Sequence, residues 1–123
     1  MSKNKTYHPD TLAVRGGLSR SQFDETSEAL YLTSGYVYSS AQEAADSFSG
    51  DLDRFVYSRY GNPTVTMLQE RMALLEGAES CRMTASGMAA VFATMASLLK
   101  SGDRVVASRA LFGACHAILT QIL

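Results

Sequence analysis

Apolar and polar residues alternate along the second half of the chain with two different periods. Helix-like spacing and short apolar runs follow one another, and this order predicts helices separated by strands. The predicted elements are a helix over 62–77, a strand over 79–85, a helix over 88–99, a strand over 105–108 and a helix from Gly113 onward. One face of the first of these helices is marked by Val65, Leu68, Met72 and Leu75. Strands that alternate with helices predict an α/β fold, the start of a doubly wound parallel sheet.

The first 60 residues follow a different pattern, rich in Ser, Tyr, Thr and Gly and without long-range periodicity. Two short helices are predicted, one over 11–15 that ends at Gly16-Gly17, and one over 41–48 that ends at Gly50. Ser40 and Glu43 have the spacing of a capping box for the second helix. A segment so sparsely structured is hard to stabilise alone. By composition it reads as a flexible N-terminus, and the alternative is an arm that wraps a neighbouring subunit.

An uncharged run over residues 83–99 is interpreted as a buried strand leading into a buried helix, since its Ser, Thr and Gly residues make it a poor membrane span. Apolar residues make up 46% of the chain, and 11 basic and 12 acidic residues leave a net charge of -1. This balance predicts a soluble globular protein without a general attraction for nucleic acid or anionic membranes. The polar residues 1–5 lack a hydrophobic signal region, so the cytoplasm is the expected location.

The residues that metal and disulfide sites need are sparse. Cys81 and Cys115 stand in unrelated contexts and predict neither a disulfide framework nor a metal site. His8 and His116 are isolated from other ligand types. No metal is therefore expected.

Residues 57–64 combine a phenol with a guanidinium directly before a helix start. On an extended segment Tyr57 and Arg59 would point the same way. A neutral hydroxyl donor beside a planar, permanently charged fork suits a phosphate dianion. Asn62 as the N-cap and Pro63 at the first helical position would fix the segment. The plainer alternative is a surface tyrosine and arginine with solvated ends.

Ser86-Gly87-Met88 forms a second candidate anion site, at the predicted turn from strand to helix. Free N–H groups at a helix start attract anions, and glycine permits close approach because no side chain intervenes. Taken alone this is weak evidence, because many such turns only allow tight packing.

The eight residues Tyr-Ser-Arg-Tyr-Gly-Asn-Pro-Thr at 57–64 resemble the signature of the Cys/Met-metabolism family of pyridoxal 5'-phosphate (PLP) enzymes. This family includes cystathionine synthases and lyases, methionine gamma-lyase and O-acylhomoserine sulfhydrylases. The resemblance implies a fold-type I (aspartate aminotransferase-like) enzyme, with residues 1–60 as an arm that contacts a neighbouring subunit and 61–123 as the beginning of the PLP-binding domain. Further matching motifs follow in the family's order at residues 8–11, 85–90, 102–106 and 111–113.

The resemblance also implies roles for individual residues. The N–H groups of Gly87 and Met88 would hold the cofactor phosphate with Ser86 nearby. Tyr57 and Arg59 would reach the same phosphate across a subunit boundary, and Tyr57 would also assist proton movement at the substrate amine. Phe112 stands where most of the family has a tyrosine that stacks on the pyridine ring; a phenylalanine in the core of the fold is the alternative.

Phe112 favours the O-succinylhomoserine sulfhydrylase branch over a typical methionine gamma-lyase, because it lacks the hydroxyl. The implied reaction is PLP-dependent replacement of succinate by sulfide on a small amino-acid substrate, giving homocysteine for methionine biosynthesis. The implied assembly is a homotetramer built from dimers that share active sites. A cystathionine gamma-synthase or gamma-lyase is the alternative within the family, and a non-catalytic phosphate-binding module is the alternative outside it.

The Schiff-base lysine of the family has no counterpart in this chain. Lys3, Lys5 and Lys100 are its only lysines, and none lies in the expected Ser/Thr-rich context. Residues 117–123 form an apolar run without a helix stop signal. We therefore expect an N-terminal piece of a longer enzyme.

Overall fold

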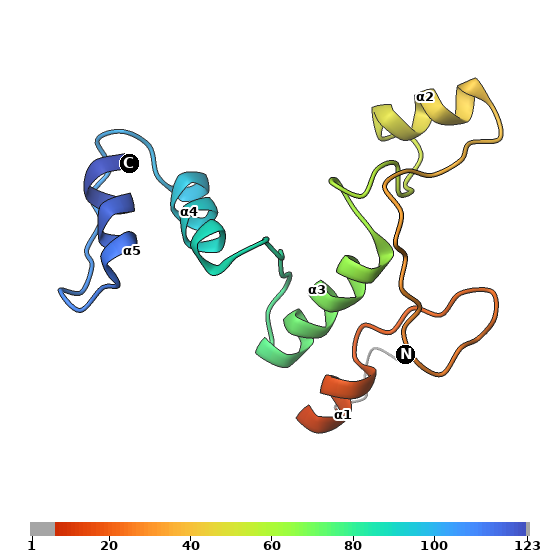
Figure 1. Ribbon diagram of the computed structural model, residues 1–123, viewed down its shortest axis with the longest axis horizontal. Coiled ribbons are helices and arrows are strands. Elements are labelled where there is room, and N and C mark those ends of the chain that lie inside the picture. Colours follow the sequence, from red (N-terminus) through yellow and green to blue (C-terminus); the bar gives the residue numbers. More distant parts are fainter. Residues whose placement is uncertain (1–6, 123) are drawn as a thin grey trace. The chain divides into compact units, whose positions relative to one another are not determined.

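The computed structural model describes residues 7–122, which belong to two compact units that divide after Arg82. Helices α1, α2 and α3 belong to the first unit, and α4, α5 and the π-helical segment η1 belong to the second (Figure 1). The polar start at residues 1–5 and the apolar end at Leu123 lie outside the described residues. The division groups α3 with the residues before it, whereas the sequence places this helix after an arm. An arm is defined by contact with another subunit, so the boundary near residue 60 stays a prediction.

Three of the helix starts and two of the helix ends lie where the local capping signals predict, whereas α1 starts at Pro9, before the predicted residue 11, and α4 ends at Leu98 and not at Leu99. Ser40, Asn62 and Ser86 each accept a hydrogen bond from a first-turn amide of the helix that they precede. Gly50 and Gly77 end their helices in the left-handed conformation. The bounds are Pro9–Arg15 for α1, Ala41–Ser49 for α2, Pro63–Glu76 for α3, Gly87–Leu98 for α4, Gly113–Ala117 for α5 and Ile118–Ile122 for η1.

Helices α1 and α3 pack together around the glycine pair that follows α1. Gly17 has a φ of +67°, and a Cβ built there would lie 2.7 Å from the carbonyl oxygen of Met67 and 2.8 Å from the amide nitrogen of Arg71. Arg71 Nε donates to the carbonyl oxygen of Gly16 at 2.8 Å, and its guanidinium pairs with Glu28. The chain therefore leaves α1 by running directly against the backbone of α3.

The buried apolar residues of α3 do not lie on the face that Val65, Leu68, Met72 and Leu75 mark. Met67 and Ala73 are the buried apolar residues of this helix, at 3% and 9% exposure. Val65, Leu68 and Leu75 are 41%, 47% and 37% exposed. The period of the helix was predicted correctly, but the glycine turn after α1 covers a different side from the one with the most apolar residues.

The two predicted strands are wrong for the described part of the chain, where residues 79–85 and 105–108 are irregular. Its one β-type pairing is an isolated antiparallel bridge between Gly35 and Tyr57. A strand needs a neighbouring strand for its N–H and C=O groups, and parallel pairs rarely stand alone. The expected burial of residues 83–99 is wrong for the same part of the chain, because α4 has no buried residue.

The second unit consists of α4 packed against α5, which continues without a break into η1. The predicted helix from Gly113 is thus confirmed. Ile118, at the junction of α5 and η1, is the buried apolar residue of this unit at 6% exposure. None of the helices within residues 7–122 is long and apolar enough to cross a membrane.

Replacing Gly17 by alanine should destabilise the folded protein more than replacing Gly50. Both have positive φ, which costs an L-residue roughly 1–2 kcal/mol. A Cβ at Gly50 would meet nothing within 4 Å, whereas at Gly17 it would collide with α3. Overpacking of this kind adds about 1–3 kcal/mol. Unfolding free energies of the two variants measure the difference, and equal losses would contradict the close approach.

Candidate functional site

Asn62 ties together the segment that carries the predicted phosphate ligands. Its side chain is buried, and its Oδ1 accepts a hydrogen bond from the amide of Thr64 at 2.9 Å, which starts α3. Its Nδ2 donates to the carbonyl oxygen of Tyr31 at 2.9 Å and to Ser58 Oγ at 3.1 Å. A single amide therefore caps the helix and fixes two other stretches of chain beside it.

A second set of hydrogen bonds joins residues 31–35 to residues 57–64. The amide of Ser58 donates to the carbonyl oxygen of Ser34 at 2.9 Å, and Ser58 Oγ donates to that of Thr33. The amide of Tyr31 donates to Thr64 Oγ1 at 2.9 Å. The residues that carry the candidate site are therefore held by contacts with a distant part of the sequence.

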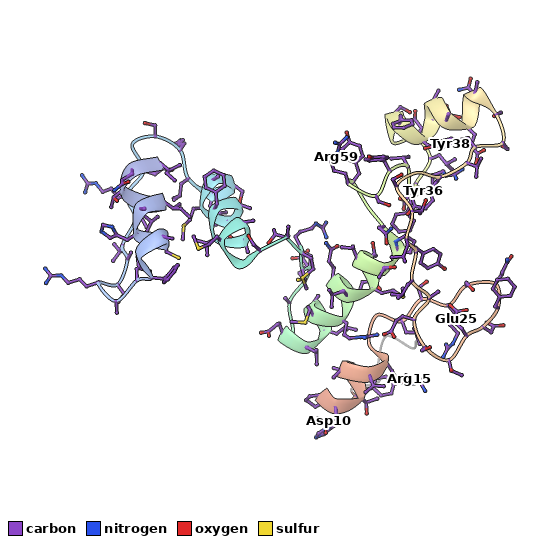
Figure 2. The ribbon with its side chains drawn as sticks, in the orientation of Figure 1. Asp10, Arg15, Glu25, Tyr36, Tyr38 and Arg59 are labelled. Carbon is purple, nitrogen blue, oxygen red and sulfur yellow. The ribbon has the colours of Figure 1, made fainter. Side chains whose placement is uncertain are left out.

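A turn begins directly after Tyr57 and spans residues 58–60, which corrects the extended segment expected from the sequence. The amides of Tyr60 and Gly61 both donate to the carbonyl oxygen of Tyr57, at 2.9 and 3.1 Å. The expected proximity of Tyr57 and Arg59 is nevertheless found, because the guanidinium carbon lies 5.1 Å from the centroid of the Tyr57 ring. It also lies 5.5 Å from the centroid of the Tyr60 ring. Arg59 projects from the loop between α2 and α3 (Figure 2).

Tyr57 and Arg59 border an open groove of about 520 Å³ in the first unit. Among residues 7–122, Arg59 forms neither a hydrogen bond nor an ion pair. Its donors are therefore available to an anionic ligand. The remaining lining residues are Tyr31, Leu32, Thr33, Ser34, Ser58, Asn62, Thr64 and Val65.

The N-terminus of α4 carries the other half of the predicted phosphate site. Ser86 Oγ accepts from the amide of Ala89 at 3.2 Å, and the Ser86 carbonyl accepts from that of Ala90 at 3.1 Å. The amides of Gly87 and Met88 come earlier in the first turn and have no acceptor within the helix. A Cβ at Gly87 would meet nothing within 4 Å, so an anion can reach both amides.

The predicted site residues fall into two groups, one in each unit. Tyr57 and Arg59 belong to the first unit, and Ser86, Gly87, Met88 and Phe112 belong to the second. Phe112 precedes α5 and is 71% exposed, so it is not part of the core of its unit. The sharing of one phosphate by the two groups stays a prediction.

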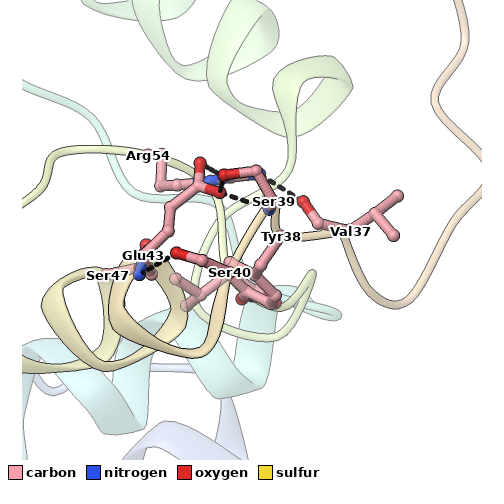
Figure 3. Close-up of polar contacts among 8 residues, drawn as sticks. Val37, Tyr38, Ser39, Ser40, Glu43, Ser47 and Arg54 are labelled. Atoms are coloured by element: carbon pink, nitrogen blue, oxygen red, sulfur yellow. Dashed lines mark hydrogen bonds and ion pairs between the residues drawn. The ribbon is translucent and has the colours of Figure 1, made fainter.

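A polar cluster around Arg54 supports the loop before Tyr57, and the sequence did not reveal it (Figure 3). Arg54 pairs with Glu43 of α2, donates to the carbonyl oxygen of Val37 at 2.8 Å, and lies 4.7 Å from the centroid of the Tyr38 ring. Tyr38 Oη donates to the carbonyl oxygen of Val56 at 3.3 Å. The cluster thus connects α2 to the residue directly before Tyr57.

Glu43 is the centre of this cluster. The hydroxyl and the amide of Ser39 donate to its carboxylate, and together with Arg54 they lower the pKa of Glu43 below its ordinary value. The capping box predicted the bond from the Glu43 amide to Ser40 Oγ, which is 3.0 Å long. It did not predict that the carboxylate would bind Ser39 and Arg54, because Arg54 lies 11 positions away and no local spacing signals that contact.

Other candidate chemistry is absent from the described residues. No group of three or more His, Cys, Asp or Glu side chains within residues 7–122 could hold a metal ion. Both cysteines are free.

The sequence matches the profile of a protein family described as "Cys/Met metabolism PLP-dependent enzyme" over residues 10–123. The chain belongs to this family. It is 59% identical over 113 residues to an O-succinylhomoserine sulfhydrylase of Mycobacterium tuberculosis, and 52% identical over 112 residues to one of Pseudomonas aeruginosa. It is 34% identical to an L-methionine gamma-lyase of Porphyromonas gingivalis. These matches cover 90–92% of this chain and 28% of each relative's length.

A solved structure supports the same family membership. It is a putative O-acetylhomoserine (thiol)-lyase of Campylobacter jejuni that contains an N'-pyridoxyl-lysine-5'-monophosphate residue. The two structures superpose with a TM-score of 0.84 at 30% sequence identity, over 94% of this chain and 29% of the other. The predicted α/β fold class of a fold-type I PLP enzyme is thereby confirmed, although the strands themselves are not formed in the described residues.

Lowering the pH should loosen the cluster around Glu43. Because its pKa is lowered in the folded state, the stabilisation is present above the ordinary value of 4.5 and is lost as the pH falls through the lower, folded value. Hydrogen exchange of peptides covering residues 36–50, corrected for intrinsic rates, should show protection near pH 6 that disappears in this acid range.

Glu43→Gln should remove this pH dependence, because the amide does not titrate there. Glu76→Gln is the matched control, since the structure shows no ion pair for Glu76 among residues 7–122. If the Glu43→Gln protein kept the wild-type profile, another group would control the order of this segment.

Proposed function

We propose that the protein containing this chain is a PLP-dependent O-succinylhomoserine sulfhydrylase, which replaces the succinyl group of its substrate with sulfide and forms homocysteine for methionine biosynthesis. The observation that carries the proposal is 59% and 52% identity to two proteins of that name over nine-tenths of the chain. The family's L-methionine gamma-lyases resemble it less, at 34% identity for the Porphyromonas gingivalis protein. Phe112 supports the same choice, because the family resemblance places it where most of the family has a tyrosine, and the missing hydroxyl argues against a typical methionine gamma-lyase.

The residues present fit the phosphate of PLP on two counts. Among residues 7–122, the guanidinium of Arg59 has neither a hydrogen-bond partner nor an ion-pair partner, and it lies beside a groove. Gly87 and Met88 have amides without helical acceptors at an unobstructed helix start. We propose that these groups and Ser86 bind the phosphate, that Tyr57 adds a hydroxyl donor, and that the ring of Phe112 stacks on the pyridine. When bound, PLP supplies the electron sink for the reaction.

Each of these residues would then have a separate role, which follows from its position relative to the cofactor. The α4 N-terminus and Arg59 both place positive charge next to the phosphate dianion, and thereby orient the cofactor. Tyr57 Oη can hold or pass a proton, since a phenol both donates and accepts hydrogen bonds. Phe112 offers an aromatic face without a hydroxyl, so it orients the ring but takes no part in proton transfer.

We further propose that residues 1–60 form an arm, through which Tyr57 and Arg59 reach the phosphate bound by a neighbouring subunit. The separation of the two groups of ligands into two compact units is compatible with this arrangement. A homotetramer of dimers that share active sites, and a cytoplasmic location, belong to the same proposal.

The reaction is tested by supplying the full-length enzyme with O-succinylhomoserine and sulfide. The expected product is homocysteine, formed faster than thiol is released from methionine under the same conditions. O-acetylhomoserine is the matched control for the acyl group. Faster turnover of methionine, or of cysteine in place of sulfide, would favour the gamma-lyase or gamma-synthase alternative.

Arg59→Ala should weaken PLP binding by the full-length enzyme. The substitution removes a charge-assisted bond to phosphate worth roughly 1.5–3 kcal/mol. Arg20→Ala, which removes an equal charge from the loop after α1, is the control.

Mixing Arg59→Ala subunits with subunits that lack the family's Schiff-base lysine should restore activity, because each restored site combines an intact half from each chain. Mixed oligomers that form but stay inactive would contradict the shared site.

A further inference from the structure

The guanidinium of Arg59 lies over two aromatic rings, and only that of Tyr57 has been assigned a role. The ring of Tyr60 has its centroid 5.5 Å from the guanidinium carbon, against 5.1 Å for Tyr57. Both rings come from one turn, which is closed by the hydrogen bond from the Tyr60 amide to the Tyr57 carbonyl at 2.9 Å. The turn therefore brings two aromatic residues to Arg59, one that precedes it in the sequence and one that follows it.

Within residues 7–122, the specific interaction of the Tyr60 side chain is the one with Arg59. The residue is 74% exposed, so packing in a core does not hold it. Its hydroxyl makes no hydrogen bond with the described residues. Its contact with Arg59 is through the ring, within the distance at which a cation and an aromatic face attract each other.

A ring over a guanidinium restrains it without using its donors. The guanidinium is planar: its faces stack on aromatic rings, while its N–H groups point outward in the plane toward carboxylates or phosphates. An arginine whose face is covered has fewer orientations left, and so loses less freedom when its edge binds an anion. Tyr60 can thus favour anion binding by Arg59 without contacting the anion.

We propose that Tyr60 is a positioning residue for Arg59, and that its ring holds the guanidinium with its N–H edge free for the cofactor phosphate. The proposal rests on the proposed function, in which Arg59 binds that phosphate. The ring carries the effect and the hydroxyl does not, so phenylalanine can replace Tyr60 and an aliphatic side chain cannot.

The test is the dissociation constant of PLP, measured by absorbance titration of the cofactor-free full-length enzyme. Tyr60→Leu should raise it roughly two- to fivefold, the loss expected for an exposed cation–π contact. Tyr60→Phe should retain the wild-type affinity. In the Arg59→Ala background, Tyr60→Leu should cause no further loss, because Tyr60 acts only through Arg59. The melting temperature of the cofactor-free Tyr60→Leu protein should match that of the wild type. Tyr60→Met is the second non-aromatic variant, should the leucine protein fail to fold.

Four outcomes would overturn the proposal. An equal loss from Tyr60→Leu with and without Arg59 would mean that Tyr60 acts by another route. A lower melting temperature of the cofactor-free variant, with unchanged affinity for PLP, would make it a packing residue. If Arg59→Ala leaves the affinity for PLP unchanged, the phosphate role of Arg59 fails and the role of Tyr60 fails with it. A normal loss from Arg59→Ala with no loss from Tyr60→Leu would reject Tyr60 alone.

Discussion

The buried amide of Asn62 is the constraint on which the candidate site in the first unit depends. A buried polar side chain is costly unless its hydrogen bonds are made, and this one makes three, to Thr64, Tyr31 and Ser58. The bond to Thr64 starts α3, and the other two fix the loop that precedes it. Because Ser58 lies within the turn at residues 57–60, the side chain of Asn62 helps to fix the position of that turn.

Local signals in the sequence were sufficient for the helix ends but not for what covers the helices. The caps at Ser40, Asn62 and Ser86 involve side chains within three residues of their partners, so their spacing can be read directly. The contact of the glycine turn after α1 with the backbone of α3 at Met67 and Arg71 instead joins residues some 50 positions apart, which no pattern within α3 can indicate. The prediction of the two strands was wrong for a related reason, because a strand is defined by the strand that pairs with it and not by its own residues alone.

The same distinction between local contacts and contacts distant in the sequence applies to the candidate site. The spacing of Tyr57 and Arg59 correctly predicted that they lie together, although a turn and a ring contact bring them together rather than an extended backbone. The helix start at Ser86 was predicted because glycine and a capping serine are visible in sequence. The ion pair between Arg54 and Glu43 was not predicted, since ion pairs between loops and helices have no fixed spacing in the sequence. The family resemblance added a hypothesis that spacing could not give, namely that both groups bind a single ligand.

The exposed apolar face of α3 has a consequence for biosynthesis. Val65, Leu68 and Leu75 are uncovered within the first unit, although they lie on a well-capped helix. The chain spans 28% of the length of its sulfhydrylase relatives, so in a protein of that size residues outside this chain are available to cover the face. Apolar surface that the rest of the fold has not yet covered is prone to aggregate, and chaperones bind such surface. While those other residues are still unfolded, this face of α3 is therefore where we expect a chaperone to bind.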